Sequence, residues 1–454
     1  MSLFAAPPAE LAPDALRQRR DRQAWRTVRA NVASKAVASG LRFVTIPLSL
    51  ALLGTQRYGL WLTVGSLLSW FNFSDLGISS GLLNTVGDAY GRDDWPAIRR
   101  YVSTAYFSYT VLSLAVAALA VGFSFWPGLP GLLGVSQEPA LLADARLLVL
   151  LCGIAFSVSF SLNAIAPLST ALQEGYLAGY FQIAGALVSC GVLALLAWRG
   201  ASLAQFAVAM AAPPLAASAS LAAYLFFVRH PGLRPRLRDW SLSSFRSLMS
   251  FGIPLQIVGL GDLGILYSMN IVISNRLGPG SVPGFAVPAS AFMVFSSLAY
   301  GLVYPYLPAY AEAQARGDWH WIRQTAFRRL AIAVGLVLAA GLGMTVLGRT
   351  AVRVWTGGRV VPEQRFLLAM AVYFVLTASA TANGILLMGL GRVKTKAAIH
   401  LSVAGVFVAG SWLLLPRLGL VAVPLAGCAA YLIDCATSLP LALRHIRRRA
   451  ALAL

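Results

Sequence analysis

Twelve long apolar stretches dominate this sequence and constrain its fold more than any other feature. A helix needs about 20 apolar residues to cross the hydrocarbon core of a bilayer. Charged residues make up only 11% of the chain, against about a quarter in soluble domains. The stretches predict an all-α polytopic membrane protein with helices at 31–54, 58–82, 101–126, 141–168, 177–198, 202–228, 248–275, 283–308, 327–348, 364–389, 396–415 and 418–442.

The distribution of positive charge predicts how these helices are oriented. Most of the 36 Lys and Arg residues fall in segments that lie on one side of the membrane if the twelve helices alternate in direction. Cytoplasmic loops carry such an excess, so both termini are expected in the cytoplasm. The net charge of +20 therefore reflects orientation, and no motif indicates nucleic-acid binding.

An internal repeat relates the two halves of the chain. At a constant offset of 224 residues, Leu53-Gly54 matches Leu277-Gly278, and the loop Arg92-Asp93-Asp94-Trp95 matches Arg316-Gly317-Asp318-Trp319. Each copy holds six helices, so both start on the same side of the membrane. We therefore expect two six-helix bundles related by a parallel pseudo-two-fold axis along the membrane normal, with a binding site at their interface.

The repeat divides the chain into five expected regions. They are a cytoplasmic N-terminal tail (1–30), an N-terminal six-helix bundle (31–228), a basic cytoplasmic linker (229–247), a C-terminal six-helix bundle (248–443) and a cytoplasmic C-terminal tail (444–454).

The repeated loop has a local interpretation as well as a functional one. Asp94 and Asp318 are predicted to cap the helices that follow them, which places Arg99 and Arg323 at the cytoplasmic surface. The alternative is that these four residues form a cytoplasmic gate.

Two cations follow one face of the first predicted helix. Lys35 and Arg42 lie on a stripe with Asn31, Thr45 and Ser49, and this spacing keeps them on one side of a helix. Charges at this depth are costly unless they face a cavity or a partner. The pair predicts a site for a phosphate or pyrophosphate, because an arginine can donate two parallel hydrogen bonds to a phosphate. Alternatively, Lys35 extends to the membrane surface and Arg42 pairs with a carboxylate.

Carboxylates inside the membrane are the second set of candidates. Asp75 and Asp262 lie within predicted helices, so each is expected either to couple ion flow to transport or to pair with Arg42. Asp434 is expected to face the eleventh helix, and Glu174 to lie in a solvated turn. The four cysteines lie in apolar runs without a C-x-x-C pair, so neither a metal site nor a cofactor is expected.

One region resembles a known family. The relevant segments are Tyr58-Gly59-Leu60-Trp61, Phe73-Ser74-Asp75-Leu76-Gly77-Ile78-Ser79-Ser80-Gly81-Leu82, Asn84 and Gly91-Arg92-Asp93-Asp94. They resemble the start of polysaccharide (O-antigen) flippases of the multidrug/oligosaccharidyl-lipid/polysaccharide exporter superfamily. The resemblance implies a V-shaped pair of bundles that opens alternately to each side. It also implies a lipid-linked (undecaprenyl-pyrophosphate) oligosaccharide as cargo for lipopolysaccharide or other surface polysaccharide, with other polysaccharide-assembly membrane proteins as conceivable partners.

Three rival functions remain open at this stage. A lipid II flippase of the same superfamily would usually have fourteen spans. A multidrug exporter would favour an acidic cavity, whereas the first helix here is cationic. A membrane polymerase or glycosyltransferase would need a large external loop or an acidic metal-binding motif, so we expect a transporter and not an enzyme.

Overall fold

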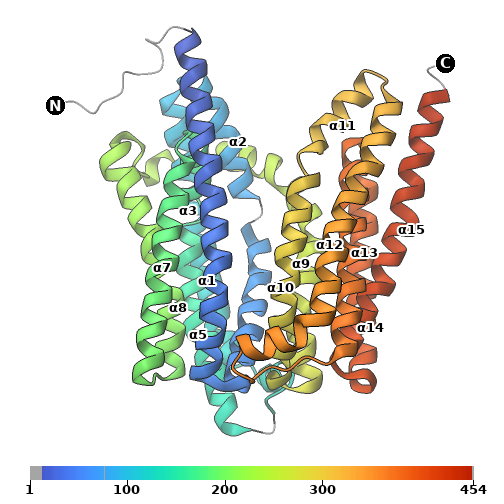
Figure 1. The fold of residues 1–454 in the computed structure, drawn as a ribbon. Helices are drawn as coiled ribbons and strands as arrows, with labels where there is room; N and C mark the ends of the chain where they lie inside the picture. The colour runs from blue at the N-terminus through green and yellow to red at the C-terminus, as the bar shows by residue number, and fades with distance from the viewer. Residues whose placement is uncertain (1–12, 76, 137, 452–454) are drawn as a thin grey trace. The chain divides into compact units, whose positions relative to one another are not determined.

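The computed structural model describes residues 13–75, 77–136 and 138–451, and their regular elements are all helical (Figure 1). Side chains are described in these ranges except at 13–25, 28, 31, 32, 72–74, 251–263 and 266. The helices are α1 (Pro13–Ser69), η2 (Trp70–Asp75), α2 (Ile78–Gly91), α3 (Trp95–Ser124), α4 (Leu129–Leu133), α5 (Pro139–Ser161), α6 (Ile165–Ala171), α7 (Gly175–Arg199), α8 (Leu203–Ala223), η3 (Tyr224–Arg229), η4 (Pro231–Leu233), η5 (Leu237–Asp239), α9 (Leu242–Leu277), η6 (Pro279–Ser281), α10 (Val282–Val303), α11 (Tyr306–Ala315), α12 (Trp319–Trp355), α13 (Gln364–Gly389), α14 (Val393–Leu418), η7 (Gly419–Val421) and α15 (Ala422–Ala451).

Nine helical segments of the described chain are long and apolar enough to cross a membrane. Two of them each contain two of the expected helices: α1 is interrupted at Gly54, and the segment Val393–Ala450 contains α14 and α15. The seventh expected helix is α9, at Leu242–Leu277. The elements therefore follow the twelve predicted stretches, except that the predicted helix 58–82 is broken: α1 ends at Ser69, and η2 and Gly77, with φ 78°, separate it from α2. The chain is a multi-pass membrane protein.

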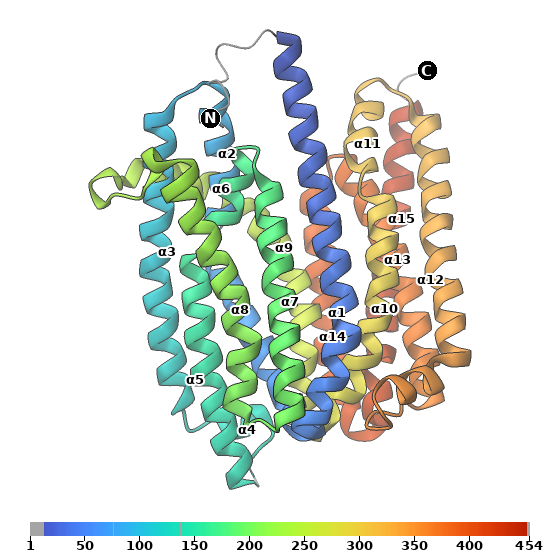
Figure 2. The same ribbon diagram turned by 60° about the vertical axis from the view of Figure 1, so that its left-hand side comes forward.

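The chain forms two compact units, each with its own apolar core. The first is drawn from Met1–Leu52, Trp70–Pro127 and Ala143–Ile257, and the second from Leu53–Ser69, Gly128–Leu142 and Val258–Leu454. Within the first unit, α7 and α8 lie side by side, as α14 and α15 do within the second (Figures 1 and 2). The first core surrounds Tyr109 and Phe160, and the second surrounds the stacked rings of Phe292 and Phe374.

The internal repeat extends to the backbone conformation. Gly54 has φ 71° and ψ 179°, and Gly278 has φ 82° and ψ 157°. Essentially only glycine adopts this region, which explains why the Leu-Gly pair recurs where one helix ends and the next begins. Asp93 and Gly317, also 224 residues apart, both have positive φ, at 55° and 74°. The two halves therefore share turns as well as sequence.

Residues 53–69 pack within the second unit through a close backbone approach. A Cβ added at Gly59 would collide with the carbonyl of Pro279 in η6. Two hydrogen bonds join the same segment to α9: the Asn270 amide donates to Ser66 Oγ at 2.9 Å, and Thr63 Oγ donates to the Asn270 carbonyl at 3.5 Å. This packing thus requires a residue without a side chain, glycine, at position 59.

Replacing Gly59 should reveal this constraint. Gly59→Ala forces a backbone carbonyl to move, and we expect it to lower the free energy of unfolding by about 1–3 kcal/mol. Gly65→Ala, on the same helix with open space around the new methyl group, is the matched control and should stabilise by up to about 1 kcal/mol. Thermal denaturation of the purified protein in detergent measures both, and equal melting temperatures would contradict the packing argument.

Candidate functional site

Lys35 and Arg42 lie on α1, in the part of the helix that belongs to the first unit, and both side chains are exposed. Other polar residues of this helix are buried instead. Ser34 donates to Gln182 Oε1 of α7 at 3.2 Å, and Ser49 donates to the Thr45 carbonyl at 2.6 Å. The predicted stripe is therefore divided: Ser49, at its far end, is buried in the unit, while its two cations are exposed. The side chain of Asn31 lies outside the described residues.

Asp75 is the last residue of η2, and a network of hydroxyl groups holds its carboxylate. Tyr109 of α3 and Ser79 of α2 both donate to Asp75 Oδ1, Ser79 at 3.3 Å, and the two hydroxyls lie 2.6 Å apart. Gly77 follows with φ 78° and turns the chain into α2, so that Ser79 lies back against Asp75. Tyr109 is fully buried, with its ring edge-on to Phe160 at 5.6 Å. The side chains that donate to Asp75 among the described residues are thus neutral hydroxyls.

Sequence reasoning missed Tyr109, which lies in an apolar run without a motif. A carboxylate predicted inside a membrane helix needs hydrogen-bond donors, and a tyrosine in the next helix could have been considered on that ground. The other carboxylate candidate, Asp262, is a residue of α9, but its side chain lies outside the described residues.

The repeated loops cap their helices as the sequence predicts. Asp94 accepts a hydrogen bond from Ala97 N, and Asp318 accepts one from Trp321 N, each at 3.0 Å. In the first unit, Arg99 forms an ion pair with Asp239 of η5, with 3.1 Å between Nε and Oδ2. In the second, Arg323 is exposed. A role of these residues in gating remains a prediction.

Glu174 corrects an expectation from the sequence. It is only 6% exposed, so its assignment to a solvated turn is wrong. Arg229 lies 2.9 Å and His230 3.3 Å from its carboxylate oxygens. Burial alone would raise the pKa of this carboxyl group, but the hydrogen bond with His230 and the charges of His230 and Arg229 outweigh burial and hold the pKa below its usual value. The short loop before α7 is thereby joined to the end of η3.

The second unit contains a buried ion pair. Lys396 Nζ of α14 lies 2.6 Å from Asp434 Oδ2 of α15, and the two side chains are 11% and 0% exposed. Asp434 thus faces the eleventh helix, as predicted. A Cβ at Gly384 of α13 would lie 2.6 Å from Lys396 Cε, so the absence of a side chain there makes room for the lysine.

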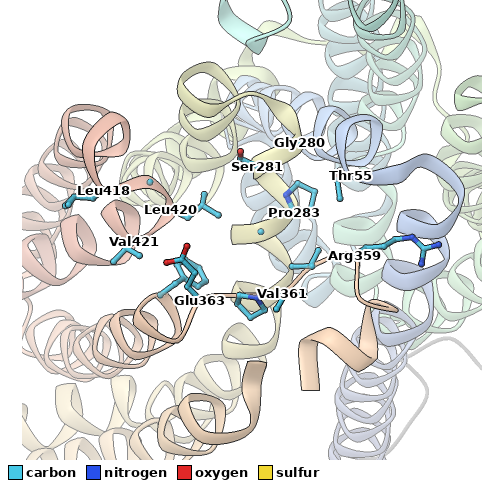
Figure 3. Close-up of a pocket in the computed structure, with 15 residues that line it drawn as sticks. Thr55, Gly280, Ser281, Pro283, Arg359, Val361, Glu363, Leu418, Leu420 and Val421 are labelled. Atoms are coloured by element: carbon cyan, nitrogen blue, oxygen red, sulfur yellow. The ribbon is translucent and has the colours of Figure 1, made fainter. Parts of the chain in front are cut away.

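A cavity of about 290 Å³ lies at one end of the second unit (Figure 3). Its walls come from the turn after Gly54, η6, the loop before α13, and η7. Figure 3 shows Glu363 projecting toward Leu420 and Val421, whereas Arg359 points away from them. The cavity belongs to the helix connections, and its lining includes none of the predicted site residues whose side chains are described.

Comparisons with known proteins support the fold. No family model matches the sequence, and no curated protein matches it. A structure described as the inward-facing conformation of a multidrug resistance MATE family transporter of the MOP superfamily is similar, with a TM-score of 0.75 and 14% identity over 92% of this chain and 94% of that one.

Two further solved structures have the same fold. The outward-facing conformation of a multidrug resistance MATE family transporter has a TM-score of 0.57 and 14% identity over 92% and 96% of the two chains. A MOP superfamily transporter from Pyrococcus furiosus, described as having a binding pocket of reverse polarity, has a TM-score of 0.58 and 13% identity over 93% and 94%. The chain therefore shares its fold with transporters of the superfamily to which the sequence resemblance points.

The buried ion pair yields a test of stability. Either Lys396→Met or Asp434→Leu alone leaves a buried polar group without its partner, and we expect a loss of about 3–5 kcal/mol in the free energy of unfolding. The double variant Lys396→Met/Asp434→Leu removes both charges and should recover most of that loss. Thermal unfolding of the four proteins measures this, and a double variant no more stable than the single variants would exclude an energetic coupling between the two residues.

Proposed function

We propose that this protein is an exporter that moves a lipid-linked, undecaprenyl-pyrophosphate oligosaccharide across the bacterial inner membrane by alternating access. Both termini lie in the cytoplasm in this proposal, because of the distribution of Lys and Arg. The superfamily fold supports transport, since its members include inward-facing and outward-facing transporter structures.

The choice of a pyrophosphate-linked cargo rests on Lys35 and Arg42, the two exposed cations of α1. An arginine at the centre of a membrane helix costs about 2.5–3.5 kcal/mol when it is inserted into lipid. Arg42 is exposed, and Lys35 is exposed two turns before it, so both are best accommodated where water or an anion reaches them. The guanidinium group can donate two parallel hydrogen bonds to a phosphate, and the ammonium adds a second charge. A pyrophosphate-linked cargo can pair with both the guanidinium group of Arg42 and the ammonium group of Lys35.

Export of drugs or toxins is the second candidate, because similar structures are described as multidrug resistance transporters. Cationic side chains on α1 disfavour the cationic compounds that an acidic cavity would select. One transporter with this fold is described as having a pocket of reverse polarity, which supports the view that the fold tolerates either sign of charge.

In the proposed cycle, Arg42 and Lys35 bind the pyrophosphate, and Asp75 and Asp262 couple the conformational change to an ion gradient. Asp75 suits this role because its carboxylate can take up a cation or a proton while Tyr109 and Ser79 rearrange around it. Asp94, Arg99, Asp318 and Arg323, at the turns that cap α3 and α12, form the proposed cytoplasmic gate.

The cargo assignment is tested by Arg42→Ala. Loss of a charge-assisted pair removes about 1.5–3 kcal/mol of binding, so transport at limiting cargo should fall at least about tenfold while membrane insertion is unchanged. The measurement is the sidedness of lipid-linked oligosaccharide in cells that depend on this protein. Arg353→Ala, which removes an exposed arginine from the end of α12, is the control. Full transport by a well-folded Arg42→Ala protein would exclude the assignment, and normal sidedness without the protein would favour a small-molecule exporter.

The coupling assignment is tested by Asp75→Asn and Asp262→Asn. Asparagine keeps the shape of the side chain and still accepts a hydrogen bond from Tyr109, but it cannot titrate. We expect transport by these variants in vesicles to lose its dependence on an imposed proton or sodium gradient. Ser79→Ala, which removes one donor but no titratable group, should keep that dependence. An unchanged dependence in both Asn variants would exclude both residues as couplers.

A further inference from the structure

The segment between η3 and α9 is held beside α3 at the depth where the membrane-spanning part of that helix begins. Arg236 N donates to Ser103 Oγ at 3.1 Å, and Ser241 N donates to Thr104 Oγ at 3.2 Å. These hydroxyls are buried and lie about two turns after the start of α3 at Trp95. The expected membrane span of this helix begins at residue 101, so the segment lies at the level of the membrane interface.

The exposed side chains of this segment alternate between apolar and cationic. Leu237 is 71% exposed, Leu242 50% and Trp240 42%, and Arg236 and Arg238, on either side of Leu237, are also exposed. Tryptophan is enriched at membrane interfaces. Apolar side chains interleaved with arginine are typical of segments that lie in the interface plane and bind anionic lipid. From Arg229 to Arg246 the sequence contains five arginines and a single acidic residue, Asp239.

A groove of about 320 Å³ adjoins this segment in the same unit. Trp95 and Arg99 of α3 form one side, and His230 and Leu233 form the other. The ring of Trp95 is stacked on His230 at 6.0 Å and remains 37% exposed. The ion pair between Arg99 and Asp239 joins the groove to η5, so the groove and the cationic segment form one continuous surface.

The cations of this surface retain free capacity for an anion. Arg99 forms its ion pair with Asp239 through Nε, and its side chain is still one-third exposed. A guanidinium group has five N–H donors, so this ion pair leaves donors available for an anion. Arg234 donates through Nε to the Phe226 carbonyl at 3.0 Å and lies over the ring of Phe227 at 4.5 Å. These contacts hold the side chain in place, and Arg234 remains exposed.

We propose that this surface, made of residues 234–242 and the groove at Trp95, is a binding site for an anionic phospholipid of the surrounding membrane. The headgroup phosphate lies against Arg236 and Arg238 at the mouth of the groove, and the acyl chains lie beside Leu237 and Trp240. A zwitterionic lipid offers the same phosphate but cancels its charge, so net negative charge is the selective feature. The site is separate from the cargo residues of α1 and does not depend on the cargo proposed above.

The experiment is a titration of the purified, delipidated full-length protein in detergent with phosphatidylglycerol or phosphatidylcholine, followed by native mass spectrometry. The wild-type protein should bind phosphatidylglycerol more tightly, and the preference should weaken as salt is raised. In Arg236→Gln/Arg238→Gln, affinity for phosphatidylglycerol should fall about 30-fold at low salt, because each arginine near an anionic surface contributes about a factor of five. The backbone hydrogen bond from position 236 to Ser103 is retained in this variant.

The matched control is Arg447→Gln/Arg448→Gln, which removes two exposed arginines from the end of α15, on the same predicted side of the membrane. Its affinity should remain within about threefold of wild type, whereas Trp240→Ala should weaken binding of both lipids. Equal affinity of the wild type for the two lipids, or an equal loss in the control pair, would overturn the proposal. Displacement of phosphatidylglycerol by inorganic phosphate alone would also overturn it, because the site would then bind a soluble anion.

Discussion

The absence of hydrogen-bond partners in hydrocarbon controls how this chain can change direction. Each peptide group at bilayer depth has to be paired within the chain, so most breaks fall near the ends of the apolar stretches. The break inside the stretch 58–82 is formed by the short 3-10 helix η2 and by Gly77. Near the ends of the stretches the chain uses backbone conformations that few side chains permit, and Gly54 and Gly278 adopt nearly the same one. Few backbone conformations allow such a turn, which explains why both halves use nearly the same one at this position.

Polar side chains inside the helices follow two patterns. Many hydroxyl groups bond within their own helix, as Thr85 does to the Gly81 carbonyl at 3.0 Å and Thr377 does to the Tyr373 carbonyl at 2.9 Å. Ionisable groups bond across helices, as Lys396 does to Asp434. A hydroxyl group can donate to a carbonyl of its own helix, whereas a buried charged group needs a partner of opposite charge. Lys35 and Arg42 are instead exposed on a membrane-spanning helix, and the proposed cargo site rests on this exposure.

Sequence reasoning predicted what depends on local composition. The apolar stretches, the repeated loop and the capping by Asp94 and Asp318 all follow from short-range rules, and the structure contains them. It did not predict the burial of Glu174, because the partners of this residue, Arg229 and His230, lie more than 50 residues away and meet it only after the unit folds. The contact between Tyr109 and Asp75 was missed for the same reason. Such pairs depend on how helices pack, which periodicity within one helix does not encode.

The two units differ in the residue that precedes α7 and α14. The residue before α7 is Glu174, which contacts His230, and the residue before α14 is Arg392, which contacts His445 at 3.3 Å. Each histidine also packs on the tryptophan of its repeated loop, Trp95 or Trp319. The geometry is therefore shared, but the charge beside the histidine is opposite. The two copies of one fold thus place a carboxylate beside the histidine in the first unit and a guanidinium group beside it in the second.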